Sequence, residues 1–119
     1  MKAGNQTIGA RLRVVVEPDI AIGPGKADIL EGVRETGSIA AAGRRMKMSY
    51  KRAWLLVEGL NASFGTPLVE TSRGGSERGG ARLTSTGDAV LDSYRRMEAL
   101  TRDAIGDELD GLRSLLRDR

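Results

Sequence analysis

The sequence of 119 residues contains no cysteine and no histidine. The lack of cysteine excludes disulfides, thiolate zinc sites and a thiol nucleophile. The lack of histidine removes the commonest general base and the commonest metal ligand. The sequence also shows no paired carboxylates beside a nucleophile and no cofactor-binding loop. We therefore predict that the protein is not an enzyme and needs no cofactor or metal.

Long apolar runs are missing as well. No stretch approaches the roughly 20 apolar residues that a membrane span needs, and residues 1–10 lack the apolar region of a signal peptide. The hydrophobic fraction of 39% is typical of a globular chain, and the length is that of one domain. We expect a cytoplasmic protein without membrane contact.

The net charge of +3 is unevenly distributed. Residues 38–82 hold eight basic and three acidic side chains, whereas residues 1–37 are neutral overall and residues 83–119 are acidic. A basic middle segment is consistent with a face that binds a polyanion. It is equally consistent with a solvated surface patch, so charge alone does not decide between the two.

Hydrophobic periodicity and turn residues predict an α+β fold that is mainly α. Pro24 and Gly25 are interpreted as a break between the first strand and the first helix, and Ser38 and Ser49 as N-caps of two further helices. The expected elements are a strand over 11–22 that Pro18 interrupts, helices over 26–35, 38–46 and 49–63, short strands over 68–72 and 81–84, and a long helix from residue 85 onward.

Residues 37–60 have the pattern of a helix-turn-helix. The connection at Lys47 and Met48 is so short that the two helices must cross closely, and the small residues 40–43 permit that approach. Apolar residues suited to fixing the crossing are Ile39, Met46, Met48, Ala53 and either Leu56 or Val57. An ordinary helical hairpin with polar caps is the alternative interpretation.

In a helix-turn-helix, the first turn of the second helix enters the major groove. Ser49, Tyr50, Lys51 and Arg52 form that turn, and they offer a hydroxyl, a phenol and two cations for phosphates and base edges. Trp54 is assigned to the core. Tyr50 is assigned to DNA contact in preference to packing. Arg44 and Arg45 are either phosphate contacts or part of a solvated face.

Residues 73–80 are rich in glycine and lie between the two short strands. Gly74 and Gly79 have the spacing of a Walker A loop, but Gly80 and Ala81 occupy the positions of its Lys and Ser/Thr, which excludes that motif. A wing fits better, with Arg73 or Arg78 directed toward a minor groove. The alternative is a flexible hairpin that makes no contact.

Three segments together resemble the N-terminal DNA-binding domain of ModE-type molybdenum-transport regulators. They are Gly37-Ser38-Ile39, the run SYKRAW over 49–54, and the stretch 74–84 followed by Gly87. The resemblance covers nearly the whole chain and implies a winged helix-turn-helix that binds double-stranded DNA as a homodimer. The chain also resembles the winged helix of LysR-type regulators. The expected DNA-contacting residues are Ser38, Arg44, Arg45, Ser49, Tyr50, Lys51, Arg52, Arg73, Gly74, Gly75 and Arg78.

The chain departs from the ModE pattern at two positions. Members of that family often have alanine at the position of Gly43 and glycine at that of Lys47, so Lys47 is expected either to adopt a left-handed conformation or to belong to a different turn. We expect a disordered tail over 1–10, a DNA-binding domain over 11–87 and a dimerisation helix over 88–119. That division leaves no room for the C-terminal molybdate-binding domains of ModE proteins, so molybdate binding is not expected.

A sequence-specific transcription regulator is the favoured function. The alternative is a protein-interaction or dimerisation module with the same fold and no operator specificity. That alternative is suggested by the absence of a sensor domain and by the acidic C-terminal helix with its stripes of leucine.

Overall fold

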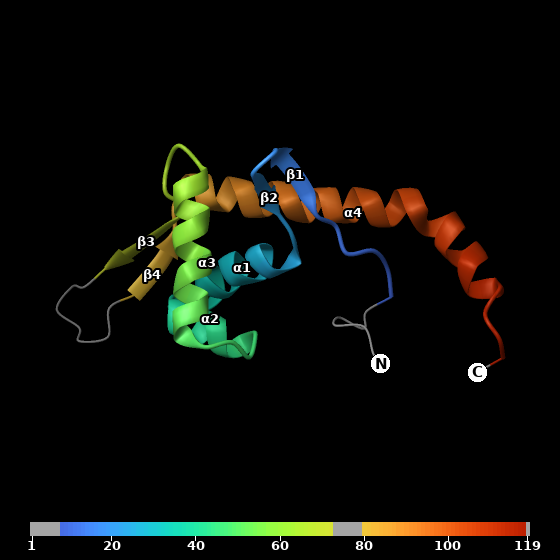
Figure 1. Ribbon diagram of the computed structural model, residues 1–119, viewed down its shortest axis with the longest axis horizontal. Helices are drawn as coiled ribbons and strands as arrows, with labels where there is room; N and C mark the ends of the chain where they lie inside the picture. Colours follow the sequence, from blue (N-terminus) through green and yellow to red (C-terminus); the bar gives the residue numbers. More distant parts are fainter. Residues whose placement is uncertain (1–7, 73–79, 119) are drawn as a thin grey trace.

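The computed structural model describes residues 8–72 and 80–118. Helices α1, α2 and α3 form a compact body, strands β3 and β4 extend from one side of it, and α4 runs across it and projects beyond it on the other side (Figure 1). In chain order, the elements are β1 (Val14–Glu17), β2 (Ile20–Ile22), α1 (Pro24–Thr36), α2 (Ile39–Arg45), α3 (Tyr50–Ser63), β3 (Val69–Ser72), β4 (Gly80–Leu83) and α4 (Ser85–Ser114).

The N-terminal region corrects the sequence prediction. The single strand expected over 11–22 is an antiparallel hairpin, in which Val14 pairs with Ile22 and Pro18 lies in the turn. Pro24 does not break the chain before α1 but is its first residue. Proline suits this position because its missing N–H would have no intrahelical partner there, and its fixed φ is already helical.

The core lies where the three helices meet the base of the β3–β4 hairpin and the first half of α4. Tyr94 of α4 is fully buried, and its hydroxyl donates a hydrogen bond to the carbonyl oxygen of Leu12 at 2.6 Å. Burial raises the pKa of the Tyr94 hydroxyl above its usual value. The largest fully buried side chains are Tyr94, Ile29, Leu30, Leu60, Leu68, Leu91, Val33 and Val57.

Two arginines fasten α4 to α1. Arg95 forms ion pairs with Asp28 at 3.0 Å and with Glu31 and Glu98 at 2.9 Å each. Arg34 of α1 forms ion pairs with Asp88 at 3.0 Å and Asp92 at 2.8 Å. These pairs lie beside the buried residues of α4 and fix its orientation on the body.

Both arginine side chains are held in the charged form. Burial lowers the pKa of Arg95, but hydrogen bonds to Asp28 and Glu98, together with the charge of Glu31, outweigh burial and raise the pKa overall. The pKa of Arg34 is raised chiefly by its hydrogen bond to Asp92.

The second half of α4 extends past the body (Figure 1). Leu100 is 67% exposed, whereas Leu91, nine residues earlier in the helix, is fully buried. Leu112, Leu115 and Leu116 near the end are also largely exposed. Among the described residues, no helix is both long enough and apolar enough to cross a membrane.

Candidate nucleic-acid interface

The turn between α2 and α3 is fixed by backbone hydrogen bonds around a left-handed lysine. Lys47 has φ of 58°, which is the first of the two alternatives that the sequence left open. The N–H of Met48 donates to the carbonyl of Gly43, and the N–H of Lys47 donates to that of Arg44, both at 3.0 Å. These two bonds form a Schellman motif, which satisfies the last carbonyls of α2 and reverses the chain directly into α3.

Small residues allow the close crossing that the sequence predicted. A Cβ at Gly43 of α2 would lie 2.9 Å from the Cβ of Ala53 in α3, which is closer than real side chains pack. On the other side of α2, a Cβ at Gly32 of α1 would lie 2.7 Å from the Cβ of Ala42. Glycine at 43 instead of alanine is therefore matched to the alanine that faces it across the crossing.

The first turn of α3 is exposed, cationic and capped. The hydroxyl oxygen of Ser49 accepts a hydrogen bond from the N–H of Arg52 at 3.1 Å, which satisfies one of the free donors of the helix. Lys51 and Arg52 are both exposed, and no acidic residue lies in this turn. Because the helix dipole already makes an N-terminus positive, two cations there are unfavourable for an isolated helix but favourable for binding an anion.

Tyr50 and Trp54 form a pair one turn apart. Their rings pack edge to face with centroids 6.3 Å apart, and the indole N–H of Trp54 donates a hydrogen bond to the hydroxyl of Tyr50. Trp54 packs against the core but is only partly buried, and Tyr50 is 55% exposed. The contact orients the Tyr50 ring and leaves its O–H proton free to donate to a partner.

The remaining candidates on α2 differ in how they are held. The hydroxyl oxygen of Ser38 caps α2 by accepting from the N–H of Ala41 at 3.0 Å. Arg45 forms an ion pair with Glu35 at 2.7 Å, so part of its charge is already neutralised. Arg44 is exposed and makes no ion pair within residues 8–72 and 80–118, so it is the better placed of the two arginines for a phosphate contact.

Asn61 of α3 ties the β3–β4 hairpin to the helix that precedes it, a role that the sequence analysis did not assign. Its Oδ1 accepts from the N–H groups of Leu68 at 2.8 Å and Val69 at 3.0 Å, and its Nδ2 donates to the carbonyl of Val69 at 3.1 Å. The N–H of Ala81 in β4 donates to the carbonyl of Gly37 at 2.9 Å. Together these bonds fix the hairpin relative to both α3 and the start of α2.

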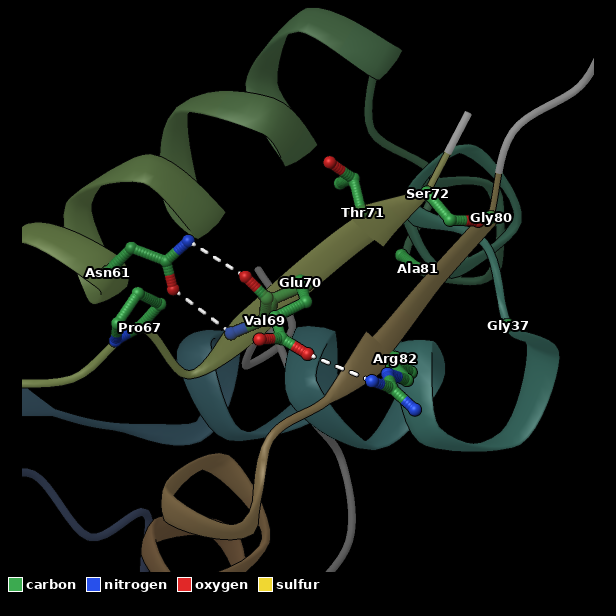
Figure 2. A pocket seen from close by; sticks show the side chains of 10 residues that line it. All are labelled: Gly37, Asn61, Pro67, Val69, Glu70, Thr71, Ser72, Gly80, Ala81 and Arg82. Carbon is green, nitrogen blue, oxygen red and sulfur yellow. Dashed lines mark hydrogen bonds and ion pairs between the residues drawn. The ribbon is translucent and has the colours of Figure 1, made fainter. Parts of the chain in front are cut away.

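A hollow of about 640 Å³ lies along this hairpin, between Asn61 and the two strands. Figure 2 shows the residues that line it. Its two charged lining residues, Glu70 and Arg82, are cross-strand partners that pair at 3.2 Å, so the hollow carries no net charge. We therefore assign the hollow no ligand. The predicted wing residues Arg73, Gly74, Gly75 and Arg78 lie outside the described residues.

Three helices with a tight turn before the third, followed by a two-stranded hairpin, define a winged helix-turn-helix. Residues 26–88 match the family of bacterial regulatory helix-turn-helix proteins of the lysR type. The chain belongs to that family. The match spans α1 to the start of α4, including the turn at Lys47 and the cationic first turn of α3.

Among its relatives, the chain is similar to proteins named for molybdenum. It is 38% identical over 85 residues to the molybdenum-pterin-binding protein MopA of Rhodobacter capsulatus, covering 71% of this chain and 32% of that one. It is 32% identical over 108 residues to the transcriptional regulator ModE of Haemophilus influenzae, covering 88% and 42%. The chain thus spans about a third of the length of most of these relatives.

The fold has a solved counterpart that contains DNA. A crystal structure of a complex of the CbnR DBD with DNA matches with a TM-score of 0.54 and 29% sequence identity, covering 78% of this chain and 97% of that one. The comparison confirms the winged helix-turn-helix predicted from the sequence.

Proposed function

We propose that the protein is a transcription regulator that binds double-stranded DNA, with the first turn of α3 in the major groove and the β3–β4 hairpin beside it as a wing. The observation that carries this proposal is the exposed turn in which Ser49 caps the helix while Lys51 and Arg52 face solvent with no acidic neighbour in the turn. Tyr50 adds a hydrogen-bond donor, and Arg44 a phosphate contact. The names of the relatives support regulation related to molybdenum.

Fluorescence anisotropy with the upstream DNA of the gene tests this function. We expect tight binding to one palindrome, weaker binding to scrambled DNA, and a steep fall in affinity with salt because phosphate contacts release counterions. The paired changes Lys51→Gln and Arg52→Gln should abolish the preference for the palindrome, whereas Arg96→Gln, on an exposed part of α4 outside the proposed contacts, should leave it unchanged. Equal affinity of the unaltered protein for both DNAs would refute sequence-specific regulation. Sodium molybdate added to the same titration tests whether the protein's DNA binding responds to molybdate.

We further propose that two copies associate through the projecting half of α4 and the residues that directly follow it. Leu112, Leu115 and Leu116 are 64%, 81% and 58% exposed, and a second copy would remove this apolar surface from water. Sedimentation velocity should give a dimer, and Leu112→Gln with Leu116→Gln should give a monomer that is equally helical. The same leucines favour the alternative of an interaction module, which would be supported if the dimer formed while DNA binding was absent.

A further inference from the structure

A second concave surface adjoins the recognition turn, and none of its lining residues belongs to β3 or β4. This hollow, of about 290 Å³, lies between the N-terminal hairpin, the start of α1 and one face of α3. None of its lining residues is acidic, and three of them are cationic. They are Arg13, Ala21, Gly23, Pro24, Gly25, Lys26, Met48, Arg52 and Leu56.

The fold brings the three cations together from distant parts of the sequence. Because Val14 pairs with Ile22 in the antiparallel hairpin, the preceding residue, Arg13, lies beside Gly23, the N-cap of α1. The ammonium of Lys26 donates to the carbonyl of Ala21 at 2.8 Å, which holds this lysine over the junction between β2 and α1.

The third cation comes from the recognition helix. Arg52 and Leu56 are four residues apart and therefore lie on one face of α3, and this face lines the hollow together with Met48 of the preceding turn. The hollow thus joins the recognition turn to the N-terminal hairpin, which lies outside the residues that match the family.

Neighbouring carboxylates do not neutralise this cluster. Asp28 of α1 is paired with Arg95 of α4 at 3.0 Å and does not line the hollow. Glu17 lies at the turn end of the N-terminal hairpin, whereas Arg13 precedes its open end. Arg13 and Arg52 are exposed and form no ion pair with any residue of the described ranges.

We infer that this hollow binds a phosphate group of the DNA backbone beside the groove that α3 enters. The inference rests on the proposed function, since Arg52 contributes to both surfaces. The shared chemistry is that of a phosphate monoanion or dianion, and a free phosphate ion is the other source. The DNA backbone is favoured because Arg52 lines the hollow and also belongs to the exposed recognition turn, so a strand bound at that turn would lie within reach of the hollow.

The test is the salt dependence of DNA binding by the full chain carrying Arg13→Gln. The log–log salt slope should fall by about 0.9 for each phosphate that the variant no longer neutralises, so a rise from 50 to 200 mM salt should weaken the variant about threefold less per phosphate than the unaltered protein. The fall in affinity should be equal for the palindrome and for scrambled DNA, because phosphate contacts carry no sequence information. Arg13→Lys should restore the slope, and Arg96→Gln on α4 is the matched control.

The outcomes separate this inference from the proposed function. If the unaltered protein does not bind DNA, both fail. If the Lys51 and Arg52 variants lose specificity while Arg13→Gln keeps the full salt slope, only the inference of a backbone phosphate site fails. A thermal shift with inorganic phosphate that is absent in Arg13→Gln, without any change in the DNA salt slope, would assign the hollow to a free anion and also overturn it. Circular dichroism of each variant checks that the fold is intact.

Discussion

Gly87 in the first turn of α4 lies directly against the carbonyl group of Leu68. A Cβ at position 87 would lie 2.2 Å from that oxygen and 3.0 Å from its carbon. The same carbonyl accepts a hydrogen bond from the N–H of Thr84 at 2.9 Å, and the Thr84 hydroxyl caps α4 by accepting from the N–H of Gly87 at 3.0 Å. The first turn of α4 therefore packs so closely against the base of the wing that position 87 has no room for a side chain.

Gly87→Ala should consequently destabilise the protein by about 2–3 kcal/mol, because backbone atoms must move to admit the methyl group. Gly106→Ala is the matched control, since a Cβ at Gly106 would meet nothing within 4 Å and alanine favours a helix interior. The control should stabilise by roughly 0.5–1 kcal/mol. Urea denaturation of both variants measures the difference, and equal effects would contradict the close approach at position 87.

Lys47→Gly should stabilise the helix-turn-helix. Lys47 has φ of 58°, a conformation that costs a residue with a side chain roughly 1 kcal/mol and costs glycine little. Part of this gain is offset because glycine makes the unfolded chain more flexible, so the expected net gain is about 0.5 kcal/mol. Arg45→Gly in the last turn of α2 should instead destabilise. A decrease in stability of Lys47→Gly would show that the lysine side chain contributes more than its conformation costs.

Asn61→Ala should loosen the wing. The change removes three hydrogen bonds and leaves the N–H groups of Leu68 and Val69 without their acceptor, at a cost of about 2–3 kcal/mol. Amide hydrogen exchange should speed up at Leu68 and Val69 more than in α1. Asn61→Asp is the informative companion, because it keeps the accepting oxygen and should retain part of the protection. An equal increase in exchange rate in all parts of the chain would contradict a local role of Asn61.

Tyr94 should make the protein sensitive to alkali. Its pKa is raised by burial, whereas the unfolded chain ionises near pH 10, so deprotonation favours unfolding. The contribution of Tyr94 to the free energy of unfolding is therefore fully present below about pH 10. It falls as the pH rises above 10, by up to about 1.4 kcal/mol per pH unit. Tyr94→Phe should cost about 1 kcal/mol at pH 7, because the hydrogen bond to Leu12 is removed, and should show a shallower alkaline decline. If the free energy of unfolding depended on pH in the same way in Tyr94→Phe and in the unaltered protein, Tyr94 would not be the group responsible for the alkaline decline.

Arg95→Met should weaken the attachment of α4 to α1. Three ion pairs are removed, and because all the partners are partly exposed the expected cost is only about 1 kcal/mol at low salt. The cost should shrink in 1 M salt, where the pairs are screened. Arg96→Met is the control, since within the described residues this arginine bonds only Ser93. A cost that does not depend on salt would point to poorer packing of the side chain stem.

Local signals in the sequence were sufficient for the helix-turn-helix. The N-caps Ser38 and Ser49 and the small residues between them act within a few positions. The left-handed conformation of Lys47 was one of two alternatives, and it came from the resemblance to regulators with glycine at that position. The N-terminal hairpin was missed because alternating β-branched residues look the same in one long strand and in two short paired ones. Pro24 was misread because proline can both break the chain and begin a helix.

The parts of the site that sequence reasoning missed depend on tertiary contacts. Asn61 looks like an ordinary polar residue near a helix end, and its partners become evident only once β3 folds back beside α3. Arg95 meets Glu31 and Asp28 from 64 and 67 positions away. The cationic hollow likewise unites Arg13, Lys26 and Arg52 from three elements. The hydrophobic periodicity of a single segment does not indicate which residues of distant segments come into contact.

Because α4 is long, a small change in how it is attached to the body moves its far end by several ångströms. The ion pairs of Arg95 hold α4 as far as Glu98, and the 16 residues from there to Ser114 span about 24 Å, so a tilt of about 7° of this segment displaces its tip by roughly 3 Å. That displacement is close to the ~3.4 Å rise of one base pair. In the proposed dimer, the contacts that hold the first half of α4 would therefore set the distance between the two recognition helices. Small changes in these contacts would alter which spacing of half-sites the two helices can reach together.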